Sequence, residues 1–237
     1  MSSTQQRTFL TAEWKNIAML NYSVDPALLR RFVPADTELD QHNGRTYISL
    51  IGFEFSKTHL FGRAIPFHQS FEEVNLRFYV RRRSRRGVVF IRELVPKVAV
   101  TVIARLAYGE RYSCVSMSHR VDRGAEGVSA EFRWGTGSAR CTISVKSQQG
   151  EYLPAEGSLS QFITEHYWGY AIRAGKTVEY QVEHPQWKVQ DAQSAQFTGA
   201  AASYYGPEFS EVLARPPDSA FFAEGSAVTV FKGEPIS

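Results

Sequence analysis

The sequence predicts an α+β protein that is dominated by antiparallel β-sheet. Stretches in which apolar and polar residues alternate recur along most of the chain, and a period of two is the pattern of a strand with one buried face. Short glycine-bearing turns join neighbouring stretches, as in hairpins. Helical patterns stand singly among the strands rather than after each one, which argues against a doubly wound α/β fold.

The composition fits one domain that spans residues 1–237. All-β and related folds reach this length without dividing, and no linker or repeat interrupts the chain. Hydrophobic residues make up 43% and charged residues 22%, as in ordinary globular proteins. A chain of this length can bury a core that needs neither a disulfide nor a metal.

The N-terminal part begins with a predicted strand at Glu13–Val24. Asp25-Pro26 is typical of a helix start, and a short helix is expected to end at Pro34. Arg45–Thr58 is predicted to be a long central strand, because apolar residues occupy both of its faces. A loop is expected over Thr58–Ser70.

The clearest alternation lies in Phe71–Val80. A second predicted strand, Val88–Val95, follows Gly87, so the two should form a hairpin with the basic run Arg81–Arg86 at its tip. One face of the first strand is apolar, with Val74, Leu76, Phe78 and Val80. The other face carries Glu73, Asn75, Arg77 and Tyr79.

This polar face has two interpretations. In a closed or strongly curved sheet, an acid, an amide, a guanidinium and a phenol in a row can line an interior cavity. Alternation of the same kind is also the ordinary pattern of a half-solvated antiparallel strand. The sequence leaves both interpretations open.

The middle of the chain is predicted to be mainly strand. Pro96–Tyr108 is ambiguous: its spacing favours a short helix, while its valines favour a strand. Three further runs, each bounded by glycine, are typical of an antiparallel meander, namely Arg111–Val121, Gly127–Trp134 and Ser138–Ser147.

The strongest helix signal begins at Ser158, which forms a capping box with Gln161. An apolar and aromatic stripe continues to Tyr170, and Gly175 lies after the expected helix end. On this helix, Glu165-His166 is interpreted as a surface pair.

The C-terminal part should add two strands, Thr177–Glu183 and Ala227–Phe231. Between them, Ala192–Ser203 is expected to be a helix or a loop. Arg215-Pro216-Pro217 should form an extended connector.

Charge is unevenly distributed, with 18 Lys or Arg against 10 Asp or Glu in residues 1–120, and 9 against 14 in residues 121–237. The Arg81–Arg86 run could contact phosphates or nucleic acid. A solvated turn that blunts edge pairing is the preferred interpretation, since no aromatic stacking platform accompanies the arginines.

Other features point to a soluble cytoplasmic protein. Cys114 and Cys141 lack CxxC spacing, no stretch resembles a signal peptide or a membrane span, and the six histidines lack ligand spacing. We therefore expect no metal, no cofactor and no membrane partner. Association into a homo-oligomer through exposed sheet or the aromatic helix stays open.

Two further candidate sites lie outside the polar face. Lys97 lies among apolar residues, where burial would lower the pKa of its amine and permit Schiff-base chemistry, although most lysines reach solvent. His184 and Trp187 break the strand before them and could cap a cavity, or simply pack at the bend.

Several stretches resemble the YqjF-like family of uncharacterised bacterial proteins. They occur in the family's order over most of the chain: Phe9–Trp14, Phe71–Val80 followed by Gly87-Val88, Ser158–Tyr167 and His184–Trp187. That family resembles the acetoacetate decarboxylase-like superfamily. The resemblance implies a curved, cone-like antiparallel β-barrel with peripheral helices and a central cavity.

The resemblance also implies catalytic residues. Acetoacetate decarboxylases use a Schiff-base lysine and a glutamate from an upstream strand, which Lys97 and Glu73 would match. The segment around Lys97 departs from the family pattern because it is shorter and has Val98 where a second lysine would stand. The neighbouring cation that lowers the amine pKa is therefore missing.

Three functions are ranked in consequence. The first is a small-molecule-binding barrel for a carboxylate- or carbonyl-bearing metabolite, with Arg77 on the anion, Glu73 as acid or base, and Asn75, Tyr79, His184 and Trp187 as further contacts. The second is a Lys97 Schiff-base decarboxylase. The third is binding of a nucleic acid or an acidic partner by Arg81–Arg86.

Overall fold

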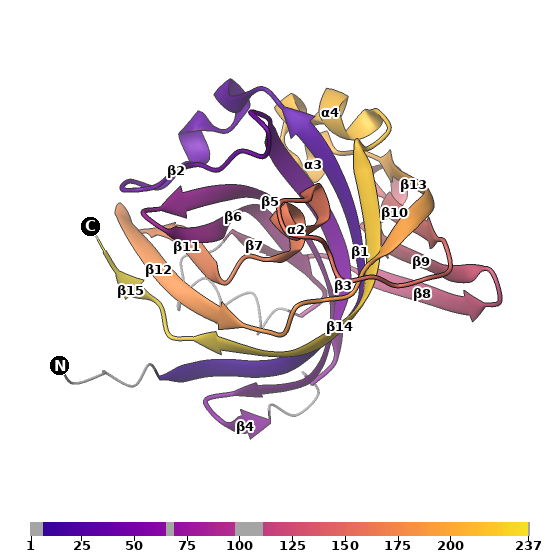
Figure 1. The fold of residues 1–237 in the computed structure, drawn as a ribbon, viewed down its shortest axis with the longest axis horizontal. Coiled ribbons are helices and arrows are strands. Elements are labelled where there is room, and N and C mark those ends of the chain that lie inside the picture. Colours follow the sequence, from indigo (N-terminus) through magenta and orange to yellow (C-terminus); the bar gives the residue numbers. More distant parts are fainter. Residues whose placement is uncertain (1–6, 65–68, 98–110, 237) are drawn as a thin grey trace.

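The computed structural model describes residues 7–64, 69–97 and 111–236, most of which lie in β-strands (Figure 1). The strands, in chain order, are β1 (Thr8–Val24), β2 (Glu38–Leu39), β3 (Thr46–Leu60), β4 (Arg63–Ala64), β5 (Phe71–Arg82), β6 (Arg85–Val95), β7 (Tyr112–Cys114), β8 (Met117–Gly124), β9 (Gly127–Trp134), β10 (Cys141–Ser147), β11 (Trp168–Arg173), β12 (Lys176–Glu183), β13 (Gln190–Gly199), β14 (Ser219–Phe231) and β15 (Glu234–Pro235). The helical segments are short: η1 (Pro26–Leu28), η2 (Arg30–Phe32), η3 (Gly137–Ala139), α2 (Leu159–Thr164), α3 (Ala202–Tyr205), η4 (Pro207–Phe209) and α4 (Ser210–Ala214). The predicted α+β class with a dominant antiparallel sheet is confirmed.

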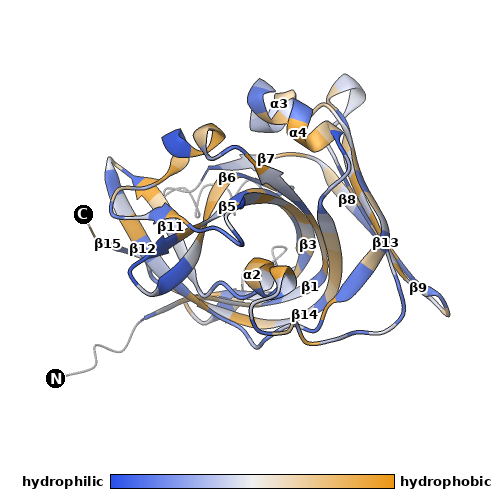
Figure 2. Ribbon diagram, turned by 45° about the horizontal axis from the view of Figure 1, so that its top comes forward, coloured by the Kyte–Doolittle hydropathy of each residue, from blue (hydrophilic) through white to orange (hydrophobic). Residues whose placement is uncertain are grey.

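A closed barrel forms the centre of the molecule. Its strands pair in the order β12, β11, β6, β5, β3, β1 and β14, and the ring closes where β14 pairs with β12, with Val182 opposite Val230. Within this ring the pairing is antiparallel except between β6 and β11. Figure 2 shows α2 in the opening of the ring.

A second sheet, made of β13, β10, β9 and β8, extends from β14 along one side of the barrel (Figure 1). Its inner face shares an apolar core with the outer faces of β1, β3 and β5, including Leu20, Leu50, Leu76, Phe132 and Ile143. A separate apolar cluster, which includes Met19, Ile51, Phe53, Phe162 and Trp187, fills part of the barrel interior. The barrel strands under the second sheet are therefore buried on both faces.

The strand β5 shows how the sequence pattern produces this arrangement. Val74, Leu76 and Phe78 point outward into the core beneath the second sheet. The alternate residues of β5 consequently face the barrel interior, where Glu73 and Asn75 are buried. Of the two interpretations of the polar face, the structure favours the interior one.

The predicted helix after Ser158 is shorter than expected. Ser158 does cap it, accepting a hydrogen bond from the Gln161 amide, but the helix ends at Thr164. The residues that follow form β11, because Trp168 and Gly169 pair with β6. Gly175 belongs to a hairpin turn rather than to a helix end: Ala174 and Gly175 have φ values of 49° and 77°, as in tight two-residue hairpins.

Three other predictions are corrected. Ala192–Ser203 is mostly strand: β13 pairs with β10 from Ala192 to Gly199, and such pairing overrides weak local preference. The helix after Asp25 consists of two 3₁₀ turns. In the basic run, only Arg83-Ser84 forms the hairpin turn, because the other arginines lie in β5 and β6.

The meander is confirmed for β8, β9 and β10, which pair in sequence. The start of the first predicted run instead forms β7, parallel to β6. The predicted strands at 13–24, 45–58, 177–183 and 227–231 are confirmed with longer bounds. Most of the ambiguous segment 96–108 lies outside the described residues.

Among the described residues, no helix has the length and apolar character that crossing a membrane requires.

Candidate functional site

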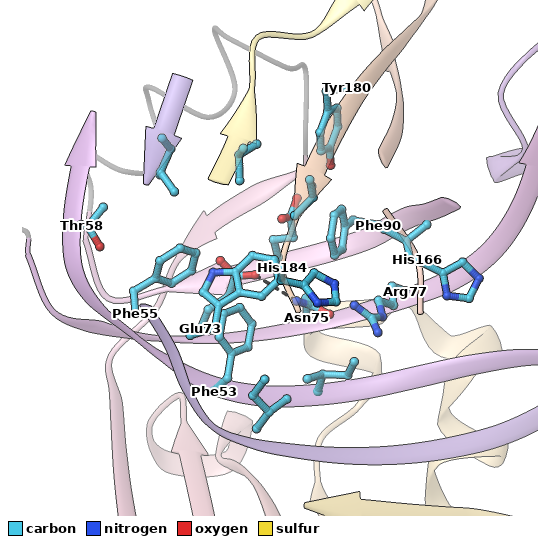
Figure 3. Close-up of a pocket in the computed structure, with 18 of the residues that line it drawn as sticks. Phe53, Phe55, Thr58, Glu73, Asn75, Arg77, Phe90, His166, Tyr180 and His184 are labelled. Carbon is cyan, nitrogen blue, oxygen red and sulfur yellow. Dashed lines mark hydrogen bonds between the residues drawn. The ribbon is translucent and has the colours of Figure 1, made fainter. Parts of the chain in front are cut away.

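The barrel encloses a cavity of about 140 Å³, several times the ~30 Å³ that one water molecule occupies in the liquid. Aromatic and aliphatic side chains make up most of its wall. A few polar groups converge in it (Figure 3), and these include Glu73, Asn75, Arg77, Glu93, Tyr112, His166 and His184.

Two buried carboxylates line this cavity, Glu73 and Glu93, and each is 2% exposed. The hydrogen bonds of Glu73 are the following. Its Oε1 accepts a hydrogen bond from Asn75 Nδ2 at 2.9 Å, and its Oε2 accepts one from Tyr112 Oη at 3.1 Å. Burial raises the pKa of Glu73 to about 7, although these two hydrogen bonds and the charge of Arg77 act in the opposite direction. Glu73 can therefore change protonation state near neutral pH.

Strand register brings the partners of Glu73 together. Asn75 on β5 lies opposite Glu93 on β6, and Glu93 in turn lies opposite Tyr112 on β7. Sequence reasoning missed both Glu93 and Tyr112. The register of the predicted hairpin could have indicated Glu93, but Tyr112 depends on a parallel pairing that has no local signal.

Arg77 lies at a break in the ladder between β5 and β6, where the register shifts after Leu76. Such bulges re-aim side chains and are common beside active sites. Its Nη2 donates to the carbonyl oxygen of Ile163 at 3.1 Å. Its Nε is buried and has no hydrogen-bond partner within the described part of the chain, and Arg77 as a whole lines the cavity.

His184 and Trp187 form one wall of the cavity. Their rings stack with centroids 4.2 Å apart. The Nδ1 of His184 lies 2.9 Å from the carbonyl oxygen of Pro185, so a neutral ring can donate from Nδ1 to this oxygen. Burial lowers the pKa of His184, with a further contribution from the charge of Arg77.

His166 corrects the prediction of a surface pair, because it is buried in the cavity wall. In Figure 3 it lies beyond Arg77. The centroid of its ring lies 4.6 Å from that of the Tyr79 ring. Neither ring nitrogen of His166 has a hydrogen-bond partner among the described residues. Burial, with the charges of Arg86 and Arg77, holds the pKa of His166 well below its usual range.

Two residues proposed from the sequence are not among the described residues that line the cavity. Tyr79 is fully buried, and its hydroxyl is hydrogen-bonded to Ser49 at 2.5 Å. Lys97 follows the end of β6 and is partly exposed.

No lysine lines the cavity in the described ranges. The segments 1–6, 65–68, 98–110 and 237 contain no lysine in their sequence. The structure therefore unites Glu73, Asn75, Arg77, His184 and Trp187 in one cavity, without Lys97.

The basic run is largely occupied by intramolecular ion pairs. Arg81 pairs with Glu38 at 3.0 Å, and Arg86 with Asp40 at 2.7 Å. Arg82 and Arg85 both pair with the buried carboxylate of Glu179, the first at 3.6 Å. These contacts favour a structural role for four of the arginines.

The described residues include no group of three or more His, Cys, Asp or Glu side chains arranged to hold a metal ion.

The sequence matches the model of the DUF2071 family, described as an uncharacterized conserved protein, over residues 11–227. It is 26% identical over 184 residues to the uncharacterized protein YqjF of Bacillus subtilis (strain 168), covering 76% of this chain and 75% of that protein.

Two solved structures show the same fold. The enduracididine biosynthesis enzyme MppR, complexed with pyruvate, superposes with a TM-score of 0.72 at 14% identity, covering 100% of this chain and 93% of the other. An acetoacetate decarboxylase from Legionella pneumophila gives 0.69 at 11% identity, covering 100% and 91%. At these identities the likeness concerns the fold alone.

Proposed function

The chain belongs to the DUF2071 family, and from its cavity we propose that it binds a small metabolite that carries both a carboxylate and a carbonyl group. One observation carries the proposal: Arg77, whose Nε has no hydrogen-bond partner among the described residues, lines the same cavity as the buried Glu73. Guanidinium groups bind carboxylates through two parallel hydrogen bonds.

The surroundings of Arg77 support an anionic ligand. Burial raises the pKa of Glu73 to about 7, so about half of the Glu73 side chains are protonated at pH 7 and do not neutralise the guanidinium. The imidazoles of His166 and His184 are uncharged at that pH, because burial lowers both pKa values. A ligand carboxylate would pair with the positive charge of Arg77 in this cavity.

The carbonyl group is proposed from the fold and from Glu73. MppR has this fold and was solved with pyruvate, a 2-oxo acid. Beside a carbonyl, the ionised Glu73 can remove a proton from the adjacent carbon, and the C–H electron pair then forms the enolate with the charge on oxygen. Return of the proton from Glu73 restores the ketone.

A binding assay tests the anion site. Calorimetric titration with 2-oxobutanoate should give a measurable Kd, and the uncharged analogue 2-oxobutanamide should bind much more weakly. Arg77→Ala should weaken 2-oxobutanoate binding roughly 10- to 100-fold, the worth of charge-assisted hydrogen bonds. Arg120→Ala is the matched control, because Arg120 is exposed and pairs with Asp122 on the second sheet. An unchanged Kd in Arg77→Ala would overturn the assignment.

Deuterium exchange tests the acid–base role. In D₂O the wild type should exchange the C3 hydrogens of bound 2-oxobutanoate faster than Glu73→Gln, as followed by proton NMR. If both proteins exchange at the same rate, Glu73 has no acid–base role, while the binding proposal stands.

An imine at Lys97 forms no part of this proposal, because no lysine lines the cavity within the described residues. Borohydride treatment in the presence of pyruvate should leave the protein mass unchanged. A stable adduct at Lys97 would restore the Schiff-base alternative.

A further inference from the structure

The cavity has an apolar end in addition to its polar group. Phe9, Tyr180 and Val182 form an apolar cluster separate from the two larger ones, with Leu10, Leu60 and Val230 packed against it. All six residues line the cavity. We call this set the apolar end.

The apolar end is built where the barrel closes. Val182 of β12 lies opposite Val230 of β14, and Leu10 of β1 lies opposite Leu60 of β3. Side chains from four strands thus converge on one region. In Figure 3, Tyr180 lies away from the group formed by Glu73, Asn75 and Arg77.

The position of the apolar end determines which part of a bound ligand contacts it. A carboxylate bound at Arg77 with its carbonyl near Glu73 leaves the rest of the molecule facing the apolar wall. No residue of the apolar end carries a formal charge, and the Tyr180 hydroxyl is its one polar side-chain group, so a charged tail would lose its hydration there without gaining a counter-ion. An apolar tail would instead remove from water both its own hydrocarbon surface and that of the cavity wall.

We propose that the ligand is an oxo acid with an unbranched or branched apolar side chain of several carbons, seated at the apolar end. This inference rests on the proposed function and specifies the substrate class of the same cavity. It sets the expected ligand apart from pyruvate, whose single methyl group would leave the apolar end uncovered.

A chain-length series tests the inference. Calorimetry with pyruvate, 2-oxobutanoate, 2-oxopentanoate and 2-oxohexanoate should show Kd falling about fourfold with each added methylene, until the end is filled. 2-Oxoglutarate, which has a charged tail, should bind more weakly than 2-oxopentanoate. Equal Kd values along the series, or tighter binding of 2-oxoglutarate, would overturn the inference.

Filling the apolar end should change the preferred length. Val230→Phe should weaken 2-oxohexanoate binding at least tenfold while changing the Kd of pyruvate by less than threefold. Val182→Phe provides a second variant should the first fail to fold. Ile172→Phe is the control, because Ile172 is 43% exposed and lies outside the cavity on β11.

The outcomes separate the two proposals. If no oxo acid of any length binds, or if Arg77→Ala has no effect, the proposed function itself fails. If the acids bind through Arg77 but neither chain length nor Val230→Phe alters their relative Kd values, only the inference about the apolar end fails.

Discussion

Tyr112 donates a hydrogen bond from its Oη to Oε2 of Glu73 at 3.1 Å, across a sequence separation of 39 residues. With Asn75 bonded to the other oxygen, both carboxylate oxygens have donors inside a largely apolar cavity. Burial favours the neutral acid, and the two donors favour the anion. The balance gives Glu73 a pKa of about 7.

Replacing Tyr112 with Phe should raise the pKa of Glu73 above about 7, because the lost hydrogen bond lowers it in the wild type. Carbon-13 NMR titration of the glutamate side-chain carboxyls measures this pKa, with the Glu73 signal assigned from its absence in Glu73→Gln. Tyr152→Phe is the matched control, since the Tyr152 hydroxyl bonds Asp191 instead. A Glu73 pKa that stays the same or falls in Tyr112→Phe would contradict the role of the phenol.

Glu73→Gln should change how stability depends on pH. The pKa of Glu73 is about 7 in the folded state against 4.5 for an ordinary glutamate, so the unfolded chain ionises first as the pH rises. The contribution of Glu73 is fully present below pH 4.5 and is lost as the pH rises through about 7. Gln does not titrate, so the variant escapes this loss, which amounts to roughly 3 kcal/mol.

Thermal melts from pH 5 to pH 8 measure this effect. The Tm of Glu73→Gln minus that of the wild type should increase with pH by several degrees. Glu126→Gln, at an exposed site that pairs with Lys146, should show no such trend. A Tm difference that is constant or falls with pH would mean that Glu73 is already ionised in the folded protein at low pH.

The sequence predicts which residues of β5 share a face, but it does not predict that the strands close into a barrel around that face. Alternation in β5 predicted that Glu73, Asn75 and Arg77 share a face, and they do line one cavity. Alternation could not decide whether that face meets solvent, because this depends on the pairing of β12 with β14. Tyr79 follows the same alternation, yet its ring packs against those of Phe162 on α2 and His166 just after it, so it is not among the described residues that line the cavity.

Helix prediction failed where spacing was compatible with two structures. Tyr167 and Tyr170 continue the helical stripe of α2, but Trp168 and Tyr170 also suit the alternation of a strand. Pairing of Trp168 with Gly87 decides for the strand, and a Cβ on Gly87 would lie 2.6 Å from the ring of Tyr170. A contact of this kind links residues far apart in the chain and has no local signature.

At Gly52 of β3, the packing between the barrel and the second sheet should be sensitive to one added methyl group. A Cβ on Gly52 would lie 2.7 Å from Cγ of Phe132, and Phe132 is fully buried between the barrel and the second sheet. Overpacking of a tight core costs about 1–3 kcal/mol, so Gly52→Ala should lower the free energy of unfolding by that amount in urea denaturation. Gly124→Ala should not, because nothing lies within 4 Å of its added Cβ.

A double mutant separates this contact from a general intolerance of side chains in β3. Phe132→Leu should itself destabilise the protein by opening a cavity, but it removes the ring atoms that an added methyl group would meet. The loss from Gly52→Ala should therefore be smaller in the Phe132→Leu background than in the wild type, giving a favourable coupling of about 1 kcal/mol. Strictly additive losses would show that the cost of Gly52→Ala arises in the barrel strand and not where the two sheets meet.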